Sequence, residues 1–135
     1  MTDRERAIAT LPGHSIALCR AETSLISDKR GIAPMMEWLG EGRDLKGFSV
    51  ADLVVGKAAA MLFVRAGIAE VFARVISRSG KDYLERHGIP VAYETLTDSI
   101  RNRAGTDICP MERTVLAIDD PEEGYLALAR RIRNC

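Results

Sequence analysis

The sequence has 135 residues, of which 47% are hydrophobic and 28% are charged. This length suits one domain, residues 1–135, with a real core, and the composition excludes intrinsic disorder. Nineteen basic and nineteen acidic residues give a net charge of zero, which argues against a dedicated nucleic-acid-binding protein. We expect residues 1–12 to form a flexible or helical extension of that domain.

The composition also predicts the compartment and the absence of a cofactor. The first residues are polar and mixed in charge, unlike a secretory signal, and charged residues interrupt the most apolar stretch, so no membrane association is expected. The three cysteines are widely spaced, and no Cys-x-x-Cys occurs. These features predict a cytoplasmic protein with no disulfide framework, no metal and no other cofactor.

The first third of the chain predicts a β-hairpin and a short helix. Residues 15–20 and 23–28 are short apolar runs separated by two residues, which is typical of a hairpin. Pro34 then occupies the first turn of a helix that carries Met35, Met36 and Trp38. This apolar group is explained equally well by core packing and by the interface of a homo-oligomer.

The middle of the chain predicts an alternation of helices and strands. Residues 49–66 are apolar almost all the way round, which indicates a central buried helix ending at Gly67. Residues 71–76 read as a strand, 81–87 as a helix and 91–95 as a second strand. This order predicts an α/β fold, a three-layer α-β-α sandwich with right-handed crossovers.

The end of the chain predicts one more helix. Asp119 and Asp120 precede Pro121 and two glutamates, which together form a strong helix start. Arg130, Arg131 and Arg133 fall in the last turn, where positive charges stabilise the helix dipole.

The hairpin, short helix, buried helix and strand-helix-strand order resembles the cytidine-deaminase-like fold. More specifically, residues 15–128 are similar to a small prokaryotic family catalogued as a domain of unknown function. The motifs that carry this resemblance are Gly31-Ile32 with Pro34, residues 51–60, residues 83–89, Asn102-Arg103-Ala104-Gly105-Thr106, Cys109-Pro110-Met111-Glu112 and residues 118–123.

The resemblance implies the fold of the zinc deaminases but not their metal chemistry. In those enzymes the buried helix opens with a ligand His or Cys, then Ala, then a catalytic Glu, and a Pro-Cys-x-x-Cys supplies the other ligands. The comparable residues here read Val50-Ala51-Asp52, and residues 77–81 contain no cysteine. The resemblance therefore implies a deaminase-like domain without zinc, which is not a zinc-dependent deaminase.

Asp52 and Lys57 are polar interruptions of the apolar segment and are candidate catalytic residues. A buried charge needs a partner, an exit to solvent or a ligand. Ser49 and Asp52 also have the spacing of a capping box, so Asp52 has a structural alternative as a helix cap. Lys57 has one as a side chain whose ammonium group reaches water.

A polar loop before a helix start supplies the candidate ligand-binding residues. Its positive charges and free N–H groups favour an anion such as a phosphate, while a capped surface loop is the alternative. Cys109 lies at the helix start, which favours the thiolate, so a nucleophile and an inert buried cysteine both stay open. The residues are Arg101, Asn102, Arg103, Gly105, Thr106 and Cys109.

Three functions remain compatible with these residues. The preferred one is a zinc-free deaminase-like domain that binds a small anionic or nucleotide-like ligand. The alternatives are an enzyme with repurposed chemistry at Cys109 or at Asp52 and Lys57, and a structural or assembly module. We also expect the turn at residues 105–109 to approach a pocket near Asp52 or Lys57, where a ligand or a substrate would bind.

Overall fold

The computed structural model describes residues 1–102 and 104–133. The strands are β1 (Ile16–Arg20), β2 (Thr23–Ser27), β3 (Ser49–Val55), β4 (Glu70–Ser77) and β5 (Val91–Thr97). The helices are α1 (Asp3–Thr10), α2 (Ala33–Gly40), α3 (Lys57–Ala66), α4 (Arg78–Arg86), α5 (Pro110–Val115) and α6 (Pro121–Arg133).

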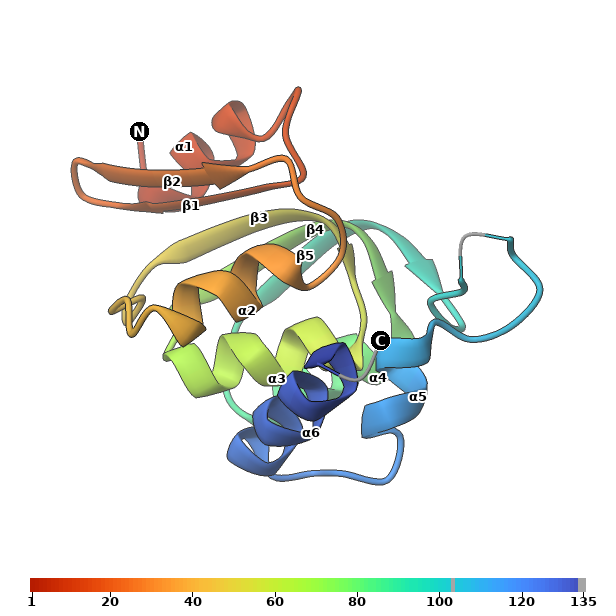
Figure 1. The fold of residues 1–135 in the computed structure, drawn as a ribbon. Helices are drawn as coiled ribbons and strands as arrows, with labels where there is room; N and C mark the ends of the chain where they lie inside the picture. The colour runs from red at the N-terminus through yellow and green to blue at the C-terminus, as the bar shows by residue number, and fades with distance from the viewer. Residues whose placement is uncertain (103, 134–135) are drawn as a thin grey trace.

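The strands form one mixed sheet in the order β2-β1-β3-β4-β5. Strand β1 is antiparallel to β2 and β3, whereas β3, β4 and β5 are parallel. Helix α1 packs on one face of the sheet, and α3 and α4 cover the other, with α2 and α6 packed on α3 (Figure 1). The predicted α/β fold with helices on both faces of a sheet is confirmed.

The elements with strong local signals lie close to their predicted positions. The hairpin is β1 and β2, joined through Ala21, whose φ of 50° supplies the left-handed turn. Helix α2 begins at Ala33 with Pro34 in its first turn, and α6 begins at Pro121. Strands β4 and β5 extend the predicted ranges by one or two residues, and α4 begins three residues early.

The single helix predicted over residues 49–66 is wrong, because the segment divides at Gly56 into strand β3 and helix α3. An all-round apolar pattern is equally typical of a strand buried on both faces, and the β-branched residues Val50, Val54 and Val55 favour the strand. The capping box proposed for Ser49 and Asp52 is also wrong, because both residues lie in β3.

Helices α3 and α4 follow β3 and β4 directly, so their N-termini meet at the carboxyl edge of the sheet. Gly80 lies in the first turn of α4, and a Cβ there would stand 2.9 Å from the carbonyl carbon of Gly56. Glycine at position 80 lets the start of α4 approach the backbone before α3 this closely.

The apolar group on α2 is divided between the core and a neighbouring cavity. Met35 and Trp38 are buried in the main core, so core packing explains them, whereas Met36 is half-buried. No helix within residues 1–102 and 104–133 is long and apolar enough to cross a membrane.

Candidate functional site

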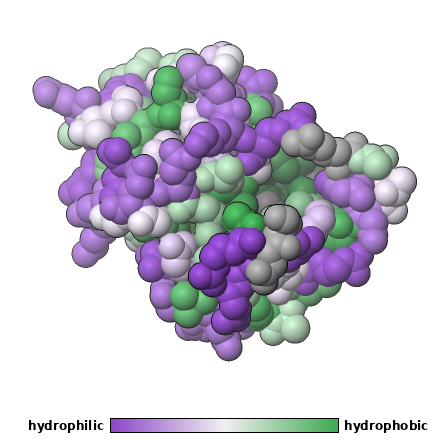
Figure 2. Space-filling model, in the orientation of Figure 1, coloured by the Kyte–Doolittle hydropathy of each residue, from purple (hydrophilic) through white to green (hydrophobic). Residues whose placement is uncertain are grey.

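Three cavities that share lining residues lie between β3 and the loop that follows β5, and together they are named here the β3 groove. Their volumes are about 730, 300 and 90 Å³, and Gly31 and Val54 line all three. Figure 2 shows the molecule hollowed beside this loop, with hydrophobic residues in the hollow. The other lining residues are Ser15, Arg30, Ile32, Asp52, Leu53, Gly56, Ala59, Ile100, Arg101, Asn102, Ala104, Cys109, Pro110, Met111 and Glu112.

The β3 groove lies where the connectivity of the sheet changes direction. From β3 the chain continues to β4 on one side, whereas β1 on the other side connects outward to β2. The end of β3 therefore stands beside the start of β1, and Ser15 and Val54 both line the groove there. In open α/β sheets, ligands bind outside the carboxyl ends of the parallel strands, and the groove lies at the carboxyl end of β3.

Glu112 closes the deep end of the groove by capping a helix far from it in the sequence. Its carboxyl group accepts hydrogen bonds from the N–H groups of Lys57, at 2.7 Å, and Ala58, at 2.8 Å. Gly56 makes room for it, because a Cβ there would lie 2.3 Å from Oε1. Both oxygens act as acceptors, as in an ionised carboxylate at a positive helix end.

The environment of Glu112 acts on its pKa in two directions. Burial raises the pKa above 4.5, while the hydrogen bonds from Ala58 and Lys57 and the Lys57 ammonium group oppose that rise. Cys109 and Glu112 have the N-cap-to-N3 spacing that predicts a capping arrangement within α5. This interpretation is wrong, since the Cys109 side chain makes no capping bond and the Glu112 carboxyl group serves α3.

Asp52 forms part of the outer wall of the groove and is only 7% exposed. Burial raises the pKa of its carboxyl group to about 8, and the backbone amides of Leu53 and Val54 oppose that shift. No charged group contributes to the shift, so the ammonium group of Lys57, the other candidate catalytic residue, does not act on the pKa of Asp52. The Lys57 ammonium group donates instead to the carbonyl oxygen of Leu116, at 3.2 Å.

The loop after β5 brings three of the predicted ligand-binding residues into the groove. Arg101, Asn102 and Cys109 line the largest cavity. Two backbone bonds close the base of the loop: Cys109 N–H donates to Ile100 O at 2.9 Å, and Asn102 N–H donates to Asp107 O at 2.8 Å. Cys109 and Asp52 line different cavities that share Arg30, Gly31 and Val54, and the approach of this turn to a pocket near Asp52 stays a prediction.

Two other predicted residues, Gly105 and Thr106, stabilise the turn of this loop. Thr106 exchanges hydrogen bonds with the Asn102 side chain, and Gly105 turns the chain with a φ of 71°. Arg103 lies outside the described residues. Sequence reasoning missed Arg30, whose place beside Arg101 in the largest cavity depends on a contact between segments about seventy residues apart.

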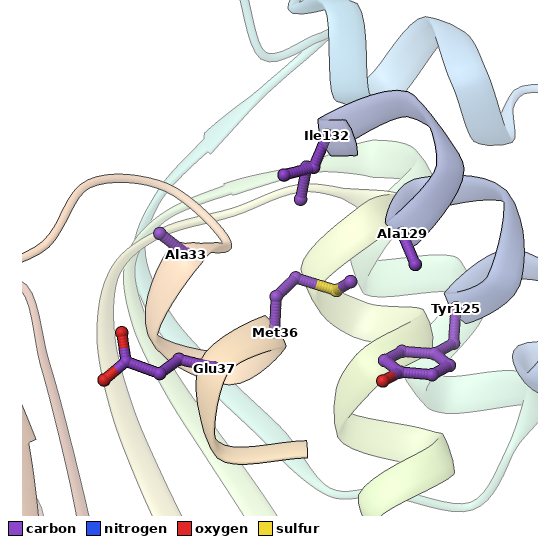
Figure 3. A pocket seen from close by; sticks show the side chains of 6 residues that line it. All are labelled: Ala33, Met36, Glu37, Tyr125, Ala129 and Ile132. Atoms are coloured by element: carbon purple, nitrogen blue, oxygen red, sulfur yellow. The ribbon is translucent and has the colours of Figure 1, made fainter. Parts of the chain in front are cut away.

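A separate cavity of about 360 Å³ lies between α2 and α6 (Figure 3). The Met36 side chain points into it from α2, and Tyr125, Ala129 and Ile132 face it from α6. The one charged lining residue, Glu37, points away from α6 and pairs with Lys29. This cavity is apolar and lacks the polar groups that gather in the β3 groove.

Residues 9–132 match the family of domains of unknown function DUF1893. The chain belongs to this family. A crystal structure of a DUF1893 family protein from Thermotoga maritima is 25% identical, with a TM-score of 0.86, and the match covers 97% of this chain and 91% of that one. The family resemblance predicted from the sequence is thereby confirmed.

A second solved structure, of a deaminase/reductase, is less similar to this chain. It is a diaminohydroxyphosphoribosylaminopyrimidine deaminase/5-amino-6-(5-phosphoribosylamino)uracil reductase from Thermotoga maritima, 16% identical, with a TM-score of 0.43 over 82% of this chain and 39% of that one. A likeness at this level says nothing about the activity of the DUF1893 chain. No curated protein sequence matches it.

Helix α3 of this DUF1893 protein starts with Lys57, Ala58 and Ala59. Val50-Ala51-Asp52 lies one element earlier, in strand β3, so its comparison with the helix start of the zinc deaminases is wrong. No group of three His, Cys, Asp or Glu side chains that could hold a metal ion occurs among residues 1–102 and 104–133.

Glu112→Gln is expected to destabilise the protein by about 2–3 kcal/mol. The glutamine amide can accept only one of the two helix N–H bonds and turns its own donors toward the other. Urea unfolding at pH 7 measures this loss. Gly56→Ala should have an effect of similar size by displacing the carboxylate. Gly40→Ala is the control, because its Cβ would meet open space; equal stabilities of all three variants would refute the capping role.

The free energy of unfolding of the wild type is expected to fall as pH rises, and the substitution Asp52→Asn is expected to remove the part of this fall that Asp52 causes. Between its ordinary pKa of 3.8 and about 8, the folded chain keeps a proton on Asp52 that the unfolded chain releases. The contribution of Asp52 is therefore complete below pH 3.8 and lost as pH rises through 8, at roughly 1.4 kcal/mol per pH unit.

Urea unfolding of both proteins from pH 5 to 8.5 checks this prediction. Asp52→Asn should become increasingly more stable than the wild type as pH rises. The exposed Asp44→Asn is the matched control. Parallel pH profiles for the wild type and Asp52→Asn would contradict the prediction.

Cys109 is expected to react with iodoacetamide in the native protein, while Cys19 stays unlabelled. Cys19 is fully buried, whereas Cys109 is partly exposed on the wall of the largest cavity. Mass spectrometry of each site against time gives the two rates, and a ligand in the groove should slow the reaction of Cys109. Equal rates at the two sites would show that Cys109 is a packing residue.

Proposed function

We propose that this protein is a ligand-binding domain that takes a small anionic, nucleotide-like molecule in the β3 groove without zinc. The observation that carries the proposal is the pair of guanidinium groups on its largest cavity. Arg30 and Arg101 are both exposed there, and neither forms an ion pair or side-chain hydrogen bond with another described residue. Arginine is the side chain best suited to bind carboxylate and phosphate groups.

The remainder of the cavity supports an organic ligand over a free ion. Val54, Ile100 and Met111 give it an apolar surface, and Asn102 adds a polar group. A volume of about 730 Å³ lies within the range of small-molecule sites, which are mostly apolar with a few placed polar groups. The place at the carboxyl end of β3 supports the same conclusion.

A second candidate function is covalent catalysis, favoured by the Cys109 thiol on the same cavity wall. A thiolate nucleophile commonly takes a histidine as its base. Neither His14 nor His87 is among the residues that line this cavity, so such a base would have to come from elsewhere. Turnover of a bound ligand that depends on Cys109 would establish this alternative.

The experiment is isothermal titration calorimetry with inorganic phosphate and the nucleoside monophosphates. We expect at least one nucleotide to bind, and Arg101→Ala and Arg30→Ala each to weaken its binding by roughly tenfold. Arg74→Ala is the matched control, because Arg74 is exposed on β4 and is not among the groove residues. Binding that survives both groove substitutions would place the ligand elsewhere, and no binding at all would refute the proposal.

A further inference from the structure

Asp52 is the residue of the β3 groove that the fold itself does not explain. It lies within β3, opposite Ile16 of β1 and Ala73 of β4, at a position where an apolar residue would suit the sheet. At 7% exposure its carboxyl group is largely removed from water, which costs free energy unless a partner compensates.

The groups around Asp52 compensate only part of the free energy that is lost when its carboxyl group is removed from water. The backbone amides of Leu53 and Val54 favour its charged form, but burial outweighs them, and no charged group acts on it. Among residues 1–102 and 104–133, no side chain forms a hydrogen bond or ion pair with this carboxyl group. It caps no helix and joins no two elements, and what it faces is the cavity of about 300 Å³.

The chemistry of that cavity favours one class of ligand group. An ionised Asp52 would repel an anion, which could bind only while Asp52 is protonated, and a purely apolar group would leave the carboxyl oxygens without a partner. A group that carries N–H donors satisfies the carboxyl group whether it is protonated or ionised, because a carboxyl oxygen accepts in both states. A positively charged amine or amidine also supplies a countercharge to Asp52, on whose pKa no charged group of the protein acts.

We infer that the Asp52 cavity is a subsite for the nitrogen-bearing group, an amine or amidine, of the ligand whose anionic group binds Arg30 and Arg101. The anionic half of this inference rests on the proposed function. Gly31 and Val54 line both cavities, so one molecule can reach across them. At Gly31 a Cβ would meet open space, and its φ of 57° favours glycine. The substrate class is therefore a small zwitterionic molecule.

The protonation of Asp52 gives this subsite a measurable signature. Its sheet neighbours Ile16 and Ala73 carry no charge, and Arg30 is the charged residue that shares its cavity. Burial raises the pKa of Asp52 to about 8, so the group holds a proton at neutral pH. Binding of a cation at Asp52 requires the ionised form, and the proton must leave to the buffer.

Benzamidine and its neutral isostere benzamide are the probes, titrated into the full chain by calorimetry. We expect benzamidine to bind the wild type more tightly than benzamide does, and its affinity to rise roughly tenfold from pH 6 to pH 7. The heat should also vary with the ionisation enthalpy of the buffer, which reports the released proton. Asp52→Asn should weaken benzamidine binding at least tenfold, because the amide replaces an anionic acceptor with N–H donors.

Asp28→Asn is the matched control, since it removes an exposed carboxylate close in sequence to Arg30 that is not among the groove residues. Benzamidine binding that is equal in the wild type and Asp52→Asn, or equal to that of benzamide, overturns the inference. The proton release of the wild type decides the matter should Asp52→Asn fail to fold. Failure of benzamidine to bind the wild type, with nucleotide binding intact, overturns the Asp52 subsite alone, whereas failure of nucleotide binding overturns the proposed function.

Discussion

The contact between the Glu112 carboxylate and the N-terminus of α3 holds the functional end of this protein together. It joins residues 54 and 55 positions apart in the sequence, at 2.8 and 2.7 Å. The first N–H groups of a helix have no partner within the helix, and a buried helix start needs one. Glu112 supplies that partner to the central helix, so the segment after β5 cannot leave α3 without exposing buried donors.

This cap also determines the shape of the β3 groove. Gly56 must lack a side chain for the carboxylate to reach the helix, and Gly80 must lack one for α4 to begin beside it. With Glu112 fixed, Cys109 and Met111 of the same segment become walls of the groove, and the loop with Arg101 projects over its outer part. The proposed ligand-binding residues of the loop thus adjoin a segment that the Glu112 hydrogen bonds hold to α3.

Local signals in the sequence were sufficient for most of the fold, but not for the strand at its centre. Pro34 and Pro121 identified helix starts correctly because their effect is confined to one turn. Residues 49–55 were mistaken for helix because a strand buried on both faces has no alternation to reveal it. Gly56 was the available sign, since a glycine between two apolar runs marks a boundary.

The site was harder to predict, because its two buried acids owe their roles to distant parts of the chain. Glu112 and Asp52 are both 7% exposed, and burial raises the pKa of each. Glu112 meets two main-chain donors of another element and completes the fold. Asp52 meets only the amides of its own strand and faces open volume. Because a carboxyl group is costly to bury, the absence of a structural contact at Asp52 is the reason for proposing a ligand subsite there rather than at Glu112.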